Sequence, residues 1–192
     1  MPSTPLFAPD EFFAQRSPSL AGAAIILIFT GVVAVASAVP YADQSPFEVT
    51  PEALVFEVLI GGLIGAAALW TIWTVAVYFL TAIVGGTGSI ARTAANIGWA
   101  SLPLLLRSTI STLTLWVLAS TGNAPPITMT QMQPPSWLLL FNVLTGVIGY
   151  VWIGYLLTYA IRDARNLDIR RSAGVAGIVI IIPLLNTALS LF

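Results

Sequence analysis

The chain has 192 residues, of which 57% are hydrophobic and only 8% are charged, and its formal net charge is −1. A soluble domain carries about 25% charged residues, so this composition excludes a water-surrounded globule and predicts that lipid surrounds most of the chain. The absence of Cys and His excludes disulfides, thiol and imidazole chemistry, and zinc sites built on those ligands. No basic face is present, so we expect no nucleic-acid partner.

The first 19 residues are predicted to form a cytoplasmic or interfacial segment. Within it, Pro9 to Arg16 has the pattern of one short helix with acidic residues in its first turn. Phe12 and Phe13 are expected at the headgroup boundary. The favoured interpretation is a plain membrane-proximal anchor, because interfacial aromatic residues usually have that role.

Five long apolar stretches follow, at about 20–39, 54–84, 97–119, 137–161 and 173–192. Each has the roughly 20 residues that a helix needs to cross about 30 Å of hydrocarbon. They predict one membrane domain, 20–192. The second stretch is long enough to tilt, to bend near Gly61 and Gly62, or to project from the bilayer. Ala36-Ser37-Ala38 has the form of a signal-peptide cleavage site, but the acidic segment before the first stretch favours an uncleaved span.

The basic residues are all arginines, and six of them occupy alternate gaps between the apolar stretches. These six are Arg16, Arg92, Arg162, Arg165, Arg170 and Arg171. Short loops that carry arginine stay in the cytoplasm. The predicted fold is therefore all-α, a polytopic membrane bundle of five transmembrane helices with its N-terminus cytoplasmic and its C-terminus outside. The predicted location is the cell membrane, and the all-arginine, acidic-pI composition suggests a prokaryotic source.

Arg107 lies inside the third stretch, near the bilayer midplane by helix rise. A charge there costs at least about 2.5 kcal/mol, so the side chain must find a partner, face the bundle or snorkel outward. Glu57, the only acid within a span, is one candidate partner. Arg107, Glu57, Asn142 and Asn186 are predicted to contribute to a polar cluster in the outer half of the bundle. A structural role for Arg107 is favoured, and anion binding is the alternative.

Three other patterns have a structural and a functional interpretation. The pairs Gly61–Gly65 and Ala173–Gly177 are predicted to pack helices inside the bundle, with a homodimer face as the alternative. The segment Gly85–Gly88 is predicted to form a tight turn rather than a phosphate cradle. The segment 162–172, expected as a loop with four arginines, either only sets topology, which is favoured, or binds anionic lipid or an acidic partner.

The stretch from Tyr78 to Leu106 combines an apolar span, a Gly-x-Gly turn, a Thr-rich segment with one base, an aromatic residue, and a proline that opens the next span. With the five-span layout, this pattern resembles the Yip1-domain family of membrane proteins. The matching positions are Gly86, Gly88, Thr93, Trp99 and Pro103.

The resemblance implies a membrane protein with partners. Eukaryotic members act in trafficking between ER and Golgi, associate with Rab-type GTPases and form complexes with related proteins, whereas prokaryotic members have no assigned activity. Only about 19 residues precede the first span here, in place of the long cytoplasmic region of those relatives, which argues against GTPase binding.

The favoured function is a non-enzymatic, Yip1-like protein that organises membrane or binds other integral proteins or itself. The alternative is a transporter or permease-type component with an outward polar cavity around Arg107; five spans without a visible inverted repeat are unusual for that class. An intramembrane enzyme ranks last, because paired intramembrane Asp and a G-x-S-x-G motif are both missing. We expect no cofactor or metal.

Overall fold

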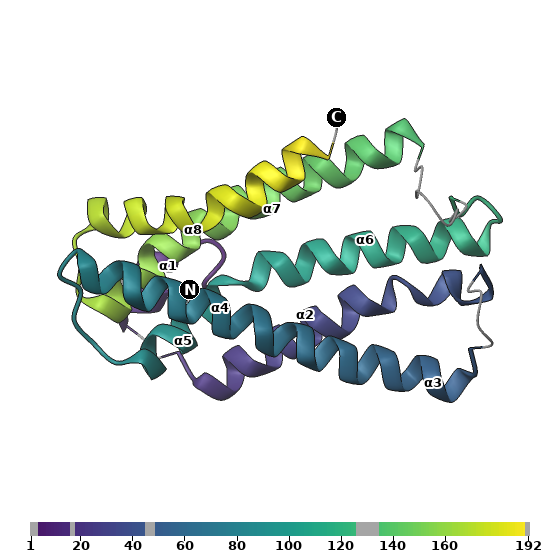
Figure 1. The fold of residues 1–192 in the computed structure, drawn as a ribbon. Helices are drawn as coiled ribbons and strands as arrows, with labels where there is room; N and C mark the ends of the chain where they lie inside the picture. Colours follow the sequence, from purple (N-terminus) through teal and green to yellow (C-terminus); the bar gives the residue numbers. More distant parts are fainter. Residues whose placement is uncertain (1–3, 16–17, 45–48, 126–134, 191–192) are drawn as a thin grey trace.

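The computed structural model describes residues 4–15, 18–44, 49–125 and 135–190. These residues form helices joined by turns, without strands (Figure 1). In chain order the elements are α1 (Pro9–Gln15), α2 (Leu20–Ala36), the 3-10 helix η1 (Val39–Gln44), α3 (Pro51–Phe56), the π-helical turn η2 (Glu57–Gly61), α4 (Gly62–Ile83), α5 (Ile90–Ala100), α6 (Leu102–Ser120), α7 (Ser136–Arg165) and α8 (Ile169–Leu189).

Five helical segments of the described chain are long and apolar enough to cross a membrane. They are Leu20–Ala42, Pro51–Ile83, Ile90–Ser120, Ser136–Arg165 and Ile169–Leu189. The all-α class and the multi-pass architecture are therefore confirmed, and the sidedness of the termini stays a prediction. The long second segment contains the π-helical turn immediately before Gly62, at the place where the sequence allowed a bend.

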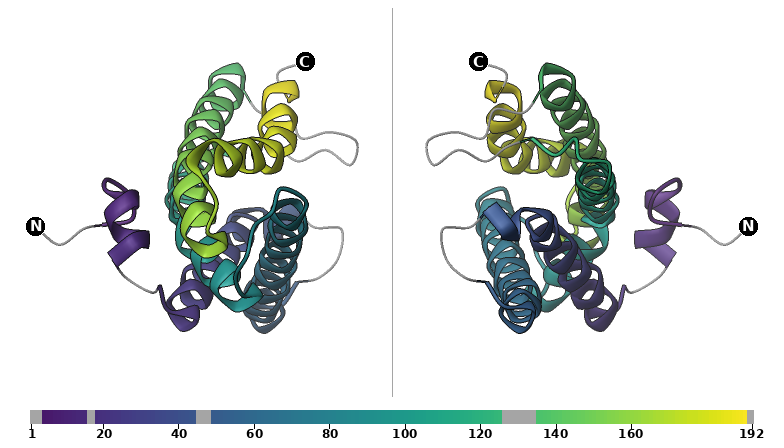
Figure 2. Two further views of the ribbon diagram at one scale, coloured as in Figure 1. Left: turned by 90° about the vertical axis from the view of Figure 1, so that its left-hand side faces the viewer. Right: turned by 90° about the vertical axis from the view of Figure 1, so that its right-hand side faces the viewer.

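The long helices run along roughly one direction, converge at one end and spread toward the other (Figure 1). We call the converging end, which carries the connections 85–89 and 166–168, the α5 end. The opposite end, where α3 begins and α6 finishes, is the α3 end. Helices α7 and α8 pack as a pair, and α2 contacts α4, α5 and α6. Helix α1 lies at the periphery (Figure 2) and contacts α7.

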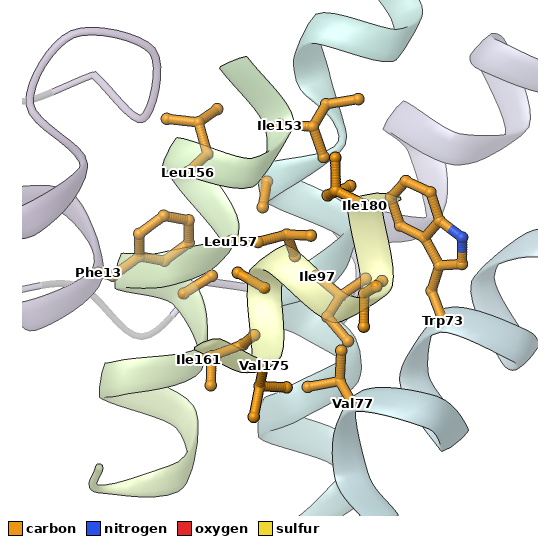
Figure 3. Packing of buried hydrophobic residues seen from close by; sticks show 14 of the residues in the cluster. Phe13, Trp73, Val77, Ile97, Ile153, Leu156, Leu157, Ile161, Val175 and Ile180 are labelled. Atoms are coloured by element: carbon orange, nitrogen blue, oxygen red, sulfur yellow. The ribbon is translucent and has the colours of Figure 1, made fainter. Parts of the chain in front are cut away.

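The apolar core lies toward the α5 end and draws residues from α1, α4, α5, α6, α7 and α8, most of which Figure 3 shows. Its larger side chains include Phe13, Trp73, Val77, Ile97, Ile153, Leu156, Leu157, Ile161, Val175 and Ile180. Phe13 is 0% exposed, and the Phe12 ring centroid lies 5.3 Å from that of Trp99. Phe12 and Phe13 therefore pack against protein rather than facing lipid, and their position at the headgroup boundary stays a prediction. Their apolar surface is buried against protein, since α1 folds back onto α7.

Helices α2 and α4 approach closely through glycines. A Cβ on Gly62 would lie 2.6 Å from Cα of Val32, and one on Gly31 would lie 2.9 Å from the carbonyl carbon of Gly62. Gly65 and Gly177, by contrast, have no other atom within 4 Å of a built Cβ. The prediction that these two residues pack helices inside the bundle is wrong, because Gly65 lines an open cleft between α2 and α4 and Gly177 lines one between α7 and α8.

The segment expected as a loop at 162–172 is mostly helical. Helix α7 continues through Arg165, Asn166 caps it in the left-handed conformation with φ 51°, and Asp168 caps α8. Arginine is a good helix former and is favourable near a helix C-terminus, so Arg162 and Arg165 extend the helix rather than ending it. Because Arg165 belongs to the last turn of α7, the helix determines the direction in which its side chain points.

Candidate functional site

The connection between α4 and α5, residues 85–89, is here called the glycine turn. Gly85 and Gly88 have φ of 85° and 120°, which residues with a Cβ rarely adopt. The hydroxyl of Ser89 then caps α5 by accepting the N–H of Arg92. The predicted tight turn is confirmed, and the glycines are required by its backbone conformation.

Arg165 reaches from the end of α7 into this turn. Its side chain is buried, with 2% of the residue exposed. Nε donates to Oγ1 of Thr81 at 2.9 Å, Nη2 donates to the carbonyl oxygen of Gly86 at 3.1 Å, and Nη1 donates to that of Gly88. The guanidinium carbon also lies 4.2 Å from the ring centroid of Tyr78, a cation–π geometry. We call Arg165, Thr81, Gly86 and Gly88 the arginine clamp.

Three further hydrogen bonds join the same two connections. The N–H of Thr87 donates to the carbonyl oxygen of Arg165 at 2.8 Å, and Nδ2 of Asn166 donates to Oγ1 of Thr87 at 3.2 Å. Nη1 of Arg171 donates to the carbonyl oxygen of Val84 at 3.0 Å. The α4–α5 and α7–α8 connections therefore form one hydrogen-bonded unit at the α5 end.

A second polar network joins α5 to α7 beside the clamp. Nη2 of Arg92 lies 2.9 Å from Oδ2 of Asp163. Nδ2 of the buried Asn96 donates to the carbonyl oxygen of Ala160 at 3.0 Å and to Oδ2 of Asp163 at 3.2 Å. Asn96 and Asp163 were not singled out in the sequence. An acid within an arginine-rich segment was the available signal for Asp163.

The five positions of the Gly-x-Gly segment have different structural roles. Gly86 and Gly88 belong to the clamp. Thr93 is buried and its hydroxyl donates to the carbonyl oxygen of Ser89. Trp99 Nε1 donates to the carbonyl oxygen of Ser19 at 3.1 Å, at the start of α2. Pro103 is buried in the first turn of α6, where a missing N–H is tolerated.

The four arginines of 162–171 do not form one exposed surface. Arg165 is inside the clamp, and the guanidinium carbon of Arg162 lies 5.1 Å from the ring centroid of Tyr159. Arg170 and Arg171 are exposed, and Nε of Arg171 lies 3.2 Å from Oδ2 of Asp168. Asp168 also accepts the N–H groups of Arg171 and Arg170. These hydrogen bonds and the Arg171 charge lower the pKa of Asp168.

Arg107 occupies a second polar region, in α6. Its Nε is buried and has no hydrogen-bond acceptor among the described residues. Its guanidinium carbon lies 5.7 Å from the ring centroid of Tyr150 on α7. A Cβ on Gly146 would lie 3.4 Å from Nε and Nη2 of Arg107, and one on Gly149 would lie 3.4 Å from its Cδ. The two glycines form a notch that admits the arginine.

Two clefts meet at Arg107. The α2–α4 cleft, of about 290 Å³, is lined mainly by apolar side chains such as Leu27, Ala66 and Leu69. The α2–α6 cleft, of about 190 Å³, is lined by Ala34, Ser37, Arg107, Ser108, Ser111, Thr112 and Leu115. Arg107 and Ser108 line both clefts.

The structure brings together only part of the expected outer polar cluster. Oγ of Ser111 lies 3.2 Å from Oδ1 of Asn142, which links α6 to α7 one helical turn beyond Arg107. Glu57 is exposed in the π-helical turn, and Asn186 is exposed on α8. Within the described chain, neither forms an ion pair or hydrogen bond with Arg107.

Comparison with known proteins gives one match. The family model of the Yip1 domain matches residues 4–190, a range that contains the arginine clamp and both clefts. Neither the curated proteins nor the solved structures compared with the chain match it. With its five membrane-length helices, the chain belongs to the Yip1-domain family of multi-pass membrane proteins.

Proposed function

We propose that this protein is a non-enzymatic membrane scaffold of the cell membrane, which binds other integral proteins or a second copy of itself through the α5 end. The observation that carries the proposal is the arginine clamp. Arg165 is buried while the turn that it holds is exposed at Gly85, Thr87, Gly88 and Ser89.

The clamp determines the shape of the turn. The guanidinium of Arg165 donates hydrogen bonds to one hydroxyl and two carbonyl oxygens, and it lies over the ring of Tyr78. Burying a charge without a carboxylate is unfavourable, and such groups are retained in some proteins because they specify one conformation. A turn held in one conformation binds a partner without the entropy cost of ordering a loop. This supports a docking surface more than a mere connection.

The charge around the turn indicates the kind of partner. Arg170 and Arg171 are exposed, and Nη1 of Arg171 lies 3.7 Å from a Cβ built on Gly85. The side chain of Arg92, at the start of α5, is 44% exposed. Exposed arginines favour a partner segment that carries carboxylates, by steering and by charge-assisted hydrogen bonds.

A photoreactive amino acid at Thr87 tests this proposal in native membranes. We expect discrete protein adducts at Thr87, and far fewer at the control position Asn123, which is exposed beyond α6. Replacing both Arg170 and Arg171 by Gln should weaken the Thr87 adducts. Adducts with lipid alone, or equal adducts at both positions, would contradict the proposal.

A second candidate function is a transporter-type component, and the clefts at Arg107 favour it. An arginine that is open to two clefts in the membrane-spanning part of a bundle is typical of a permeation site for anions. Flux of a radiolabelled inorganic anion into proteoliposomes, compared between the wild type and Arg107→Gln, tests it. Equal flux in the two proteins and in empty vesicles excludes this role.

A further inference from the structure

We propose that Arg107 and Ser108 form a binding site for an oxyanion of the phosphate class at the junction of the α2–α4 and α2–α6 clefts. The proposal goes beyond the scaffold function and does not require transport. A resident lipid with a phosphate group would occupy the site as well as a soluble anion would. The shared chemistry is a compact group with several acceptor oxygens and at least one negative charge.

Two arginines of the same bundle, Arg165 and Arg107, differ in the acceptors around them. Arg165 has three oxygen acceptors and an aromatic ring against its guanidinium. Arg107 has a ring, that of Tyr150, but no carboxylate and no acceptor for its buried Nε among the described residues. A guanidinium has five N–H donors in a fixed fork that matches oxyanions. The free donors of Arg107 therefore call for an acceptor from outside the described chain.

Arg107 lies deep within its membrane-length segment. About 20 Å of helix separates Arg107 from the end of α6 at Ser120, and the segment extends farther in the other direction, to Ile90. The side chain is therefore well inside the span, where a charge without a counter-ion is strongly unfavourable. An anion bound against it offsets part of this penalty, because two opposite charges in contact attract each other more strongly where the dielectric constant is low.

The surroundings of Arg107 are closely packed on one side and open on the other. On the α7 side, Gly146 and Gly149 fit closely around the arginine, as the short distances to their built Cβ positions show. On the α2 side the two clefts leave space next to it. The guanidinium is thus held from one side and open on the other, which is the arrangement of a site rather than of a packed core.

The hydroxyls of the α2–α6 cleft are unequal. Oγ of Ser111 is paired with Asn142, and Oγ1 of Thr112 donates to the carbonyl oxygen of Val33. Ser108 faces both clefts beside Arg107, so it is the hydroxyl that is placed to donate to a bound oxyanion. The neighbouring α2–α4 cleft is apolar and suits an acyl chain, whereas the α2–α6 cleft suits a free anion.

The test measures thermal unfolding of the purified full chain in nanodiscs by tryptophan fluorescence. The two probes are phosphatidylglycerol mixed into phosphatidylcholine nanodiscs, and inorganic phosphate added to pure phosphatidylcholine nanodiscs. At least one probe should raise the melting temperature. Arg107→Gln should weaken the apparent affinity roughly tenfold or more, the loss expected for hydrogen bonds to a charged group. The matched control Arg162→Gln, outside the clefts, should respond like the wild type.

Two further variants keep the test informative if Arg107→Gln does not fold. Ser108→Ala should weaken binding of the effective probe while leaving the charge in place. Gly65→Leu should fill the mouth of the α2–α4 cleft, since Gly65 lines it with open space around its Cβ position. Its control is Gly174→Leu on α8, where the built Cβ also meets open space.

The outcomes separate the two sources of the anion. If phosphatidylglycerol stabilises the wild type but not Gly65→Leu, while the phosphate effect stays intact, the occupant is a lipid headgroup whose chain lies in the α2–α4 cleft. If phosphate stabilises both proteins and phosphatidylglycerol stabilises neither, the occupant is a soluble anion. The site is excluded if neither probe shifts the melting temperature, or if Arg107→Gln and Ser108→Ala respond like the wild type. Anion flux, measured separately in proteoliposomes, bears on transport and leaves the binding result unchanged.

Discussion

Arg165 donates a hydrogen bond to the carbonyl oxygen of Gly88, which is 77 residues away in the sequence. The bond joins the end of α7 to the turn before α5. It therefore links the two connections at this end of the bundle. The conformation of the most distinctive sequence segment thus depends on a residue far outside it.

Arg165→Leu should lower the free energy of unfolding by about 3 kcal/mol, because it leaves the buried hydroxyl of Thr81 and the part-buried carbonyl oxygens of Gly86 and Gly88 without this donor. Arg165→Lys should have an intermediate effect, since it keeps the charge and loses the planar fork. Unfolding in mixed micelles measures both. The exposed Arg170→Leu is the control, with a change within about 0.5 kcal/mol. Equal stability of Arg165→Leu and Arg170→Leu would show that the clamp does not hold the turn.

Gly62→Ala should destabilise the bundle by about 1–3 kcal/mol, the usual effect of overpacking. Its Cβ would lie 2.6 Å from Cα of Val32, so α2 and α4 must move apart. Gly65→Ala in the same helix meets open space and should be neutral or slightly stabilising, because Ala favours helix more than Gly does. The two melting temperatures, measured side by side, check this. If both variants have the same melting temperature, α2 and α4 lie farther apart than the short distances at Gly62 indicate.

Phe13→Ala should cost about 3–5 kcal/mol, as for other buried aromatic residues, because Phe13 is 0% exposed in the core. Phe7→Ala should have little effect, since Phe7 is 80% exposed. Unfolding in mixed micelles gives both values. A small effect at Phe13 would support the headgroup-anchor interpretation and would remove α1 from the bundle core.

Local information predicted the helices well. The five spans follow from runs of apolar residues, which each segment carries by itself. The glycine turn follows from Gly85 and Gly88, whose positive φ is a local property of the chain. The sequence does not indicate the end of α7, because arginines after an apolar run are typical of a loop, whereas their long side chains allow the helix to continue to Arg165.

Tertiary information was not predictable in the same way. Whether Gly62 or Gly65 meets α2 depends on the rotation of α4 about its axis, which sequence spacing leaves open. The burial of Phe13 depends on α1 folding back onto α7. The partners of Arg165 lie 77 to 84 residues away, and a pattern of charges cannot indicate that one arginine of four points inward.

Acid should weaken the start of α8 through Asp168. Hydrogen bonds from the N–H groups of Arg171 and Arg170 lower the pKa of this carboxyl in the folded state. Its contribution to stability is therefore present above about pH 4, the ordinary value for Asp, and is lost as the pH falls through the lower folded pKa. Asp168→Asn keeps a capping side chain that does not titrate. The melting temperature of the wild type should thus fall more steeply with acid than that of Asp168→Asn; parallel curves would rule out this linkage.

The predicted orientation places the glycine turn in the cytoplasm, and the cysteine-free sequence makes this simple to test. Thr87→Cys lies in the exposed glycine turn at the α5 end, and Asn123→Cys is exposed beyond α6 at the α3 end. In intact cells a membrane-impermeant maleimide should label Asn123→Cys, and it should label Thr87→Cys only after the membrane is permeabilised. The reverse pattern would show that the arginines of the α5 end do not follow the positive-inside rule. It would also move the proposed docking surface, and any acidic partner of Arg170 and Arg171, to the outside of the cell.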